Sequence, residues 1–172
     1  NAVEEARRRE TLVVENPGAP NARLSYPLDC VSNSLSKQEK FEHPDNIFFL
    51  TMDATGKFPA VSRISGNTIK RFFETGYTSQ MPGTEAGSNE IKKTFSPCYG
   101  SPFMPRKIEL YTSMLMEKIK NTNANVFLIN TGMGPNGNRF PLEFTRNCVK
   151  QAMTTKYDDR SEEVLEILEG LL

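Results

Sequence analysis

Two short apolar runs stand out along a chain of otherwise mixed character. One covers residues 47–51 and the other residues 125–130, and turn-forming residues flank both of them. Continuous apolar runs of this length are typical of strands that are buried on both faces of a sheet. The pattern therefore predicts two buried strands.

Helical periodicity is clearest over about residues 105–121. Apolar residues recur there at intervals of three and four, on one face of the predicted helix: Ile108, Tyr111, Leu115 and Ile119. Shorter helices are predicted over 68–74, with Gly76 as the C-cap, and over 144–154. Helices that alternate with buried strands predict an α/β fold, with a mixed sheet and flanking helices.

The two ends of the chain differ from its middle. Residues 1–20 mix charges, break into a loop-forming stretch and stay unassigned. Residues 157–172 contain a predicted amphipathic helix whose apolar side chains need a partner surface: Val164, Leu165, Leu168, Leu171 and Leu172. Residues 21–156 between them are predicted to form one partial domain.

One stretch does not fit the strand and helix patterns. Residues 77–103 are rich in Gly, Pro, Thr and Ser and contain few apolar repeats. A loop of that length inside a compact domain is uncommon and is usually functional or disordered. Its glycines suit a mobile lid, so a flexible loop is predicted near residues 79–95.

Composition narrows the classes of function. Lys plus Arg and Asp plus Glu both total 21 in the 172 residues, which leaves no broad basic field for nucleic acid or an anionic membrane. The three cysteines, Cys30, Cys98 and Cys148, form no CxxC pair, so a disulfide scaffold and a structural zinc site are not expected. No apolar run approaches the roughly 20 residues that cross a bilayer. We therefore expect a cytoplasmic protein, and the absence of an initiating Met suggests a fragment or a processed product.

Several blocks along the chain can be read together. Residues 21–27 have the form Asn-x-Arg-x-x-Tyr-Pro, and further blocks follow in order: 46–63, 73–78, 83–87, 94–100, 130–132 and 137–146. In their order and spacing these blocks resemble the C-terminal part of ATP-dependent phosphoenolpyruvate carboxykinases. The resemblance covers about residues 21–155 and implies that the predicted sheet is part of the C-terminal nucleotide-binding domain of that fold.

The resemblance also implies an activity. Enzymes of this family decarboxylate oxaloacetate and phosphorylate the resulting enolate with ATP, which gives phosphoenolpyruvate, CO2 and ADP in gluconeogenesis. They use Mg2+ with the nucleotide and a second divalent ion, commonly Mn2+. Oxaloacetate, phosphoenolpyruvate, ATP and ADP are therefore the ligands that the resemblance implies for the intact enzyme.

Two sets of site residues follow from the match of the early blocks. Arg23, the arginine of the Asn-x-Arg block, would contact the transferred phosphoryl group, a task that suits a planar and permanently charged guanidinium. The 83–87 block falls in the family's active-site lid, with Gly83, Thr84, Glu85 and Gly87 as its members.

The family's adenine-side contacts match three further residues: Arg139, Phe140 and Thr145. An arginine or an aromatic ring can stack on a purine, and a threonine hydroxyl can hydrogen-bond to its edge. The alternative is structural, with a turn over 134–138, a core phenylalanine and a threonine in the first turn of a helix. Met133 and Asn138 stand where Trp and Lys are common in the family, which weakens the adenine assignment.

The parts of the family's site that hold phosphates and metals are not found. No G-x-x-x-x-G-K-[ST] motif occurs in the sequence, and the single histidine, His43, is interpreted as a surface loop residue without clustered ligands, so no metal site is predicted. In the family these parts lie upstream of the matched region, so the chain is predicted to be inactive alone. Two alternatives stay open: a non-catalytic module that binds adenine nucleotide or protein, and one half of a split enzyme whose N-terminal half carries the P-loop.

Overall fold

The computed structural model describes residues 27, 30–31, 41–80 and 91–172. The chain divides into two units, Asn1–Glu42 with Met81–Glu90 and His43–Gln80 with Ile91–Leu172. The second unit contains all of the helices and strands described below.

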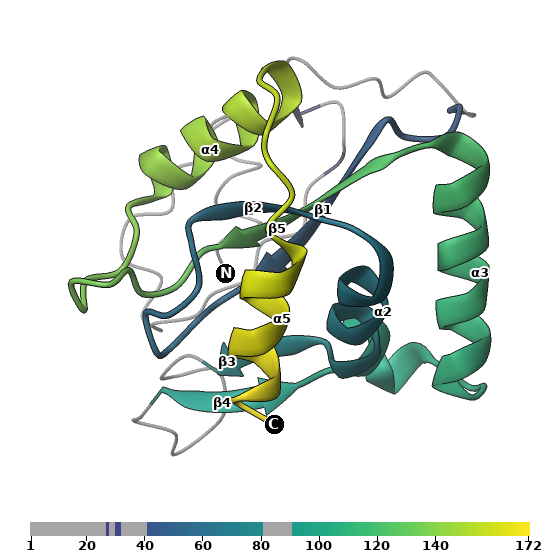
Figure 1. The fold of residues 1–172 in the computed structure, drawn as a ribbon, viewed down its shortest axis with the longest axis horizontal. Helices are drawn as coiled ribbons and strands as arrows, with labels where there is room; N and C mark the ends of the chain where they lie inside the picture. Colours follow the sequence, from purple (N-terminus) through teal and green to yellow (C-terminus); the bar gives the residue numbers. More distant parts are fainter. Residues whose placement is uncertain (1–26, 28–29, 32–40, 81–90) are drawn as a thin grey trace. The chain divides into compact units, whose positions relative to one another are not determined.

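A three-stranded mixed sheet forms the centre of this unit (Figure 1). Strand β5 (Asn125–Asn130) lies in the middle, parallel to β1 (Asn46–Thr51) and antiparallel to β2 (Val61–Ile64). Both faces of β5 are covered, which explains its uninterrupted apolar sequence. The predicted mixed sheet with flanking helices is thus confirmed, and the two apolar runs correspond to β1 and β5.

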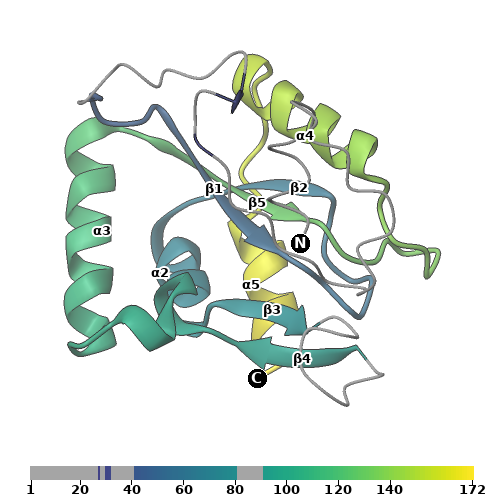
Figure 2. The same cartoon turned by 180° about the vertical axis from the view of Figure 1, so that it is seen from behind.

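Three helices cover one face of the sheet. They are α2 (Gly66–Thr75), α3 (Ile108–Thr122) and α5 (Ser161–Glu169), and α5 lies in front of the sheet in Figure 1 and behind it in Figure 2. Their apolar side chains join those of the strands in one core: Phe49, Phe58, Ile64, Ile69, Phe72, Tyr77, Val126, Leu128, Val164 and Leu168. Leu115 and Ile119 of α3 pack against this core and are partly buried.

The burial of α5 changes one expectation. Val164 and Leu168 are both fully buried in the core described above, and an ion pair of 2.7 Å joins Arg71 of α2 to Glu169 of α5. The partner surface that Val164 and Leu168 were expected to need is therefore the core of the chain itself. Leu172, at 56% exposure, stays outside the core.

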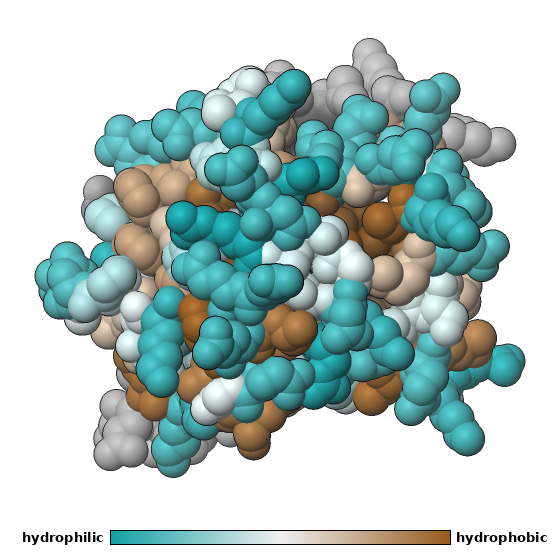
Figure 3. All heavy atoms as spheres, viewed as in Figure 1, coloured by the Kyte–Doolittle hydropathy of each residue, from teal (hydrophilic) through white to brown (hydrophobic). Residues whose placement is uncertain are grey.

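Helix α4 (Leu142–Thr154) packs on the opposite face of the sheet. Ala152 of this helix joins Phe127 and Ile129 of β5 in a second, smaller cluster. Leu50 of β1, whose register partner is Ile129, is 55% exposed. Hydrophobic residues also reach the surface at several places between hydrophilic ones on the face drawn in Figure 3.

A β-hairpin occupies part of the stretch that was predicted to be a loop. Strands β3 (Tyr77–Gln80) and β4 (Lys92–Phe95) pair antiparallel, with Tyr77 opposite Phe95. The flexible loop predicted near 79–95 was therefore wrong at both of its ends, and residues 81–90 lie outside the described residues. The strands escaped prediction because only alternate residues of β3 are buried and β4 is largely exposed, so neither has a continuous apolar run.

Gly76 ends α2 as predicted and joins this helix to the hairpin. It has a left-handed conformation, with φ of 56° and ψ of 43°. A Cβ atom there would lie 1.8 Å from the carbonyl oxygen of Ser96, so only glycine fits without a shift of the backbone. Two 3-10 turns, Pro97–Tyr99 and Ser101–Phe103, then lead from β4 to α3.

Candidate nucleotide-binding site

The carboxyl ends of β1 and β5 lie at the same edge of the sheet because the two strands are parallel. Residues 52–58 follow β1 there and residues 131–140 follow β5. In open α/β sheets, ligands bind outside the carboxyl ends of the strands. The two loops are therefore the natural place to look for a site.

Asp53 organises the first loop. Its fully buried carboxylate accepts hydrogen bonds at Oδ1 from the Thr55 N–H (2.8 Å) and hydroxyl (2.7 Å) and from the Tyr77 hydroxyl (3.1 Å). Its Oδ2 accepts from the N–H groups of Lys57 (2.7 Å) and Phe58 (3.0 Å). These five donors offset the cost of burying a charge. Burial first, and then the negative charge of Asp53, raise the pKa of Tyr77 to about 12, so the phenol keeps its proton at neutral pH.

Asn130 joins the first loop to the second. Its buried side chain accepts hydrogen bonds at Oδ1 from the N–H groups of Asp53 (3.2 Å) and Gly132 (2.8 Å). Its Nδ2 donates to the carbonyl oxygens of Phe58 (3.0 Å) and Met133 (3.1 Å). One amide side chain therefore fixes the backbones of both loops at the end of β5.

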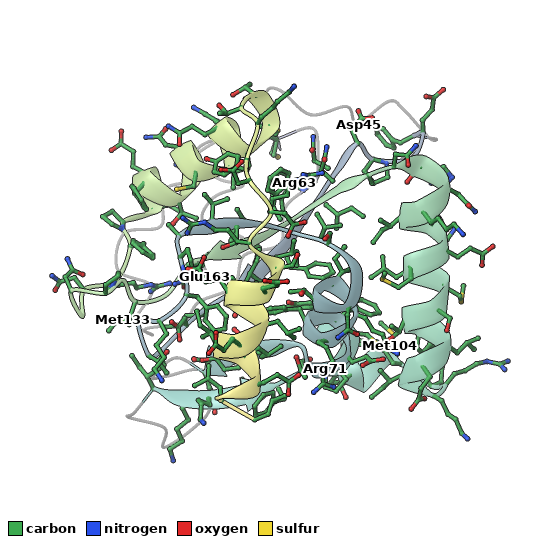
Figure 4. The ribbon with its side chains drawn as sticks, in the orientation of Figure 1. Asp45, Arg63, Arg71, Met104, Met133 and Glu163 are labelled. Atoms are coloured by element: carbon green, nitrogen blue, oxygen red, sulfur yellow. The ribbon has the colours of Figure 1, made fainter. Side chains whose placement is uncertain are left out.

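The second loop folds back on itself before α4. An isolated bridge pairs Met133, labelled in Figure 4, with Arg139, and the Gly134 N–H donates to the Asn138 carbonyl over 2.9 Å. The turn over 134–138, which the structural alternative for this stretch included, is therefore present.

The three predicted adenine-side residues lie at the end of this second loop and the start of α4. Arg139 is exposed, and its Nε donates to the Thr131 carbonyl over 3.2 Å. Phe140 is half-buried and stacks on Phe144 with 5.2 Å between ring centroids. The hydroxyl of Thr145, in the first turn of α4, donates to the Pro141 carbonyl over 3.3 Å. The structure thus brings Arg139, Phe140 and Thr145 into one short stretch beside the sheet edge.

Other predicted site residues cannot be placed in this arrangement. Arg23 and the lid residues Gly83, Thr84, Glu85 and Gly87 lie outside the described residues. His43 is exposed next to α3. Within residues 41–80 and 91–172, no group of three or more His, Cys, Asp or Glu side chains could hold a metal ion. Over the same ranges, no helix has the length and apolar character needed to cross a bilayer.

A separate open cavity of about 570 Å3 lies where β1 and β5 begin, close to the segment after α4. Its lining includes Asn46, Arg63, Asn125 and Tyr157, and it contains none of the predicted site residues. Its position at the amino ends of the parallel strands is opposite to the edge where ligands of such sheets bind. We therefore assign the candidate site to the loops after β1 and β5.

Sequence reasoning missed Asp53 and Asn130. Both follow apolar strand residues, and each is a polar residue at or just past the end of a buried strand. Asp and Asn favour turns because their side chains bind nearby backbone groups. A polar residue of this type at the carboxyl end of each of two buried strands was therefore the signal in the sequence that could have predicted these two residues.

Comparison with known proteins identifies the family. The sequence model described as phosphoenolpyruvate carboxykinase, of the ATP-dependent type, matches residues 1–169. This range extends beyond the 21–155 over which the sequence blocks were recognised.

Individual relatives agree with that match. The phosphoenolpyruvate carboxykinase (ATP) of Christiangramia forsetii is 41% identical over 143 residues, which cover 81% of this chain and 27% of that protein. The protein of the same name from Shouchella clausii is 38% identical over 164 residues, 87% of this chain and 31% of that protein. The one from Roseobacter denitrificans is 38% identical over 157 residues, 89% of this chain and 29% of that protein. The chain thus spans less than a third of the length of these relatives and belongs to the family of ATP-dependent phosphoenolpyruvate carboxykinases.

Proposed function

We propose that this chain supplies the purine side of the ATP site in a phosphoenolpyruvate carboxykinase, which converts oxaloacetate and ATP to phosphoenolpyruvate, CO2 and ADP. One observation carries the proposal. Arg139, Phe140 and Thr145, the residues that match the family's adenine contacts, are grouped at the carboxyl edge of the sheet.

The chemistry of the three side chains suits a purine. The guanidinium of Arg139 can lie flat on the base, and the ring of Phe140 can contact its apolar surface. Thr145 uses its hydrogen to bind Pro141, so its oxygen still has a lone pair that can accept a hydrogen bond from the adenine amino group. The loop is already fixed by its own hydrogen bonds, so little ordering is needed when the nucleotide binds.

The phosphate side of the reaction is assigned to other residues. Arg23 would contact the transferred phosphoryl group, and Gly83, Thr84, Glu85 and Gly87 would belong to a lid that excludes water from the enolate. The described residues offer no ligand set for Mg2+ or Mn2+, and we derive no step through a metal ion.

The P-loop and the metal ligands would come from the further part of the enzyme that the longer relatives contain, whether on the same polypeptide or on a separate one. Phosphoryl transfer depends on positioning and on neutralising charge, so the 172 residues alone would lack activity. The cytoplasm is the proposed compartment, in keeping with the free cysteines Cys30, Cys98 and Cys148.

The proposal is tested by titrating ADP into the full-length gene product and its Arg139→Ala variant by calorimetry. Loss of a cation–π contact of about 1–2 kcal/mol predicts an ADP dissociation constant raised by about 5- to 30-fold. Arg106→Ala is the matched control, because it removes an exposed arginine that precedes α3. An equal ADP affinity in wild type, Arg139→Ala and Arg106→Ala would remove Arg139 from the site.

A further inference from the structure

The two loops at the candidate site approach each other backbone to backbone. A Cβ atom at Gly132 would lie 2.2 Å from the carbonyl oxygen of Asp53, so no side chain can fit between the loops at that point. The Met133 N–H donates directly to the same carbonyl over 2.7 Å. Because these backbone contacts are so close, the second loop can move little relative to the first. A residue that fixes the distance between the two loops therefore also fixes the positions of the residues on the second loop.

Asn130 is placed to fix that spacing. It is 1% exposed, and its amide uses two acceptor and two donor interactions, all with backbone groups. Two of the partners, Asp53 and Phe58, belong to the first loop, and the other two, Gly132 and Met133, belong to the second. An amide can satisfy two carbonyl groups and two N–H groups at once, which neither a carboxylate nor a hydroxyl can do.

A short path of hydrogen bonds leads from Asn130 to the predicted purine contacts. The Gly132 peptide group donates its N–H to Asn130, and the Gly132 carbonyl accepts the N–H of Phe140 over 2.9 Å. The neighbouring carbonyl of Thr131 accepts the Nε of Arg139 over 3.2 Å. The backbone of Phe140 and the side chain of Arg139 are therefore each hydrogen-bonded to one of the two residues that directly follow Asn130.

We propose that Asn130 is a positioning residue for nucleotide recognition: it fixes the 131–140 loop against the 52–58 loop and thereby sets the places of Arg139 and Phe140. The inference rests on the proposed function, because it takes this loop to be the purine side of the site. Asn130 itself touches neither the nucleotide nor the reacting atoms in this account.

The test uses the full-length gene product with Asn130→Ala and Asn130→Asp. Alanine removes all four hydrogen bonds. Aspartate has nearly the same shape as asparagine, but it places a negatively charged oxygen against the carbonyl oxygens of Phe58 and Met133, where Asn130 donates hydrogen bonds. If alanine prevents folding, the aspartate variant carries the test. Leu168→Ala is the control for lost stability, because it empties a fully buried position on α5 and leaves all four hydrogen bonds of Asn130 in place.

Steady-state kinetics and hydrogen exchange give the readouts. Each folded Asn130 variant is expected to raise the KM for ATP by about 10-fold with a much smaller change in kcat, because a displaced remote contact weakens ground-state and transition-state binding alike. Amides over residues 131–140 are expected to exchange faster. Leu168→Ala should lower the melting temperature and leave the KM for ATP unchanged.

The outcomes separate this inference from the proposed function. A KM for ATP within two-fold of wild type in a folded Asn130 variant would overturn the positioning role, even where Arg139→Ala weakens ADP binding. If Arg139→Ala has no effect while the Asn130 variants raise the KM and speed exchange over 131–140, positioning is supported and only the contact assigned to Arg139 fails. An equal rise in KM for Leu168→Ala would show a general loss of stability and would also overturn the inference.

Discussion

Replacing Asp53 with alanine tests the network beneath the candidate site. The carboxylate is fully buried and accepts five hydrogen bonds. Thr55 and Lys57 are exposed residues, so their donors can turn to water in the variant. The N–H of Phe58 and the hydroxyl of Tyr77 belong to fully buried residues and would lose their partner.

The magnitude follows from these two buried donors. Each unpaired buried donor costs about 1–3 kcal/mol, so Asp53→Ala is expected to lower the free energy of unfolding by about 2–6 kcal/mol. Urea unfolding of the full-length gene product, followed by circular dichroism, measures this loss. Asp45→Ala is the control, since Asp45 is exposed before β1 and its removal is expected to change stability by less than about 0.5 kcal/mol. A loss below about 1 kcal/mol for Asp53→Ala would refute the view that this carboxylate holds the loop together.

Two further predictions concern the same region. Gly76→Ala is expected to lower the melting temperature more than Gly66→Ala does. Both glycines have a positive φ, but only at Gly76 would an added Cβ atom meet a backbone atom, the carbonyl oxygen of Ser96 at 1.8 Å. Equal effects of the two substitutions would refute the close contact with Ser96. For Tyr77, the pKa raised to about 12 means that the folded state holds the phenolic proton more tightly than the unfolded state, whose tyrosine pKa is about 10. The resulting stability is present below about pH 10 and is lost as the pH rises toward 12. Over this range, urea unfolding should therefore show a smaller fall in the free energy of unfolding for Tyr77→Phe than for wild type. Identical pH profiles for the two proteins would contradict the raised pKa of Tyr77.

The sequence predicted the elements whose apolar residues form a clear pattern, either an uninterrupted run or a helical spacing. Strands β1 and β5 emerged from their apolar runs because the central strand is covered by helices on both faces. Helix α3 emerged from its three- and four-residue spacing, although Leu115 and Ile119 are only partly buried. Strands β2, β3 and β4 are four residues each, too short and too mixed in polarity for a period to show.

The candidate site was predictable only in part. The resemblance proposed Arg139, Phe140 and Thr145 for the site, and these residues lie close together along the chain. Asp53 and Asn130 are 77 positions apart, and their contact exists only because β1 and β5 pair in parallel with one register. A single sequence gives the type of each residue but not the pairing of distant strands, so the network between the two loops required the structure.

A crystal structure of the full-length gene product with bound ADP would decide whether the loop after β5 forms the purine side of an ATP site. We expect the adenine ring to contact Arg139 and Phe140, with its amino group hydrogen-bonded to the hydroxyl of Thr145. An adenine ring bound elsewhere, with the 131–145 segment empty, would contradict it.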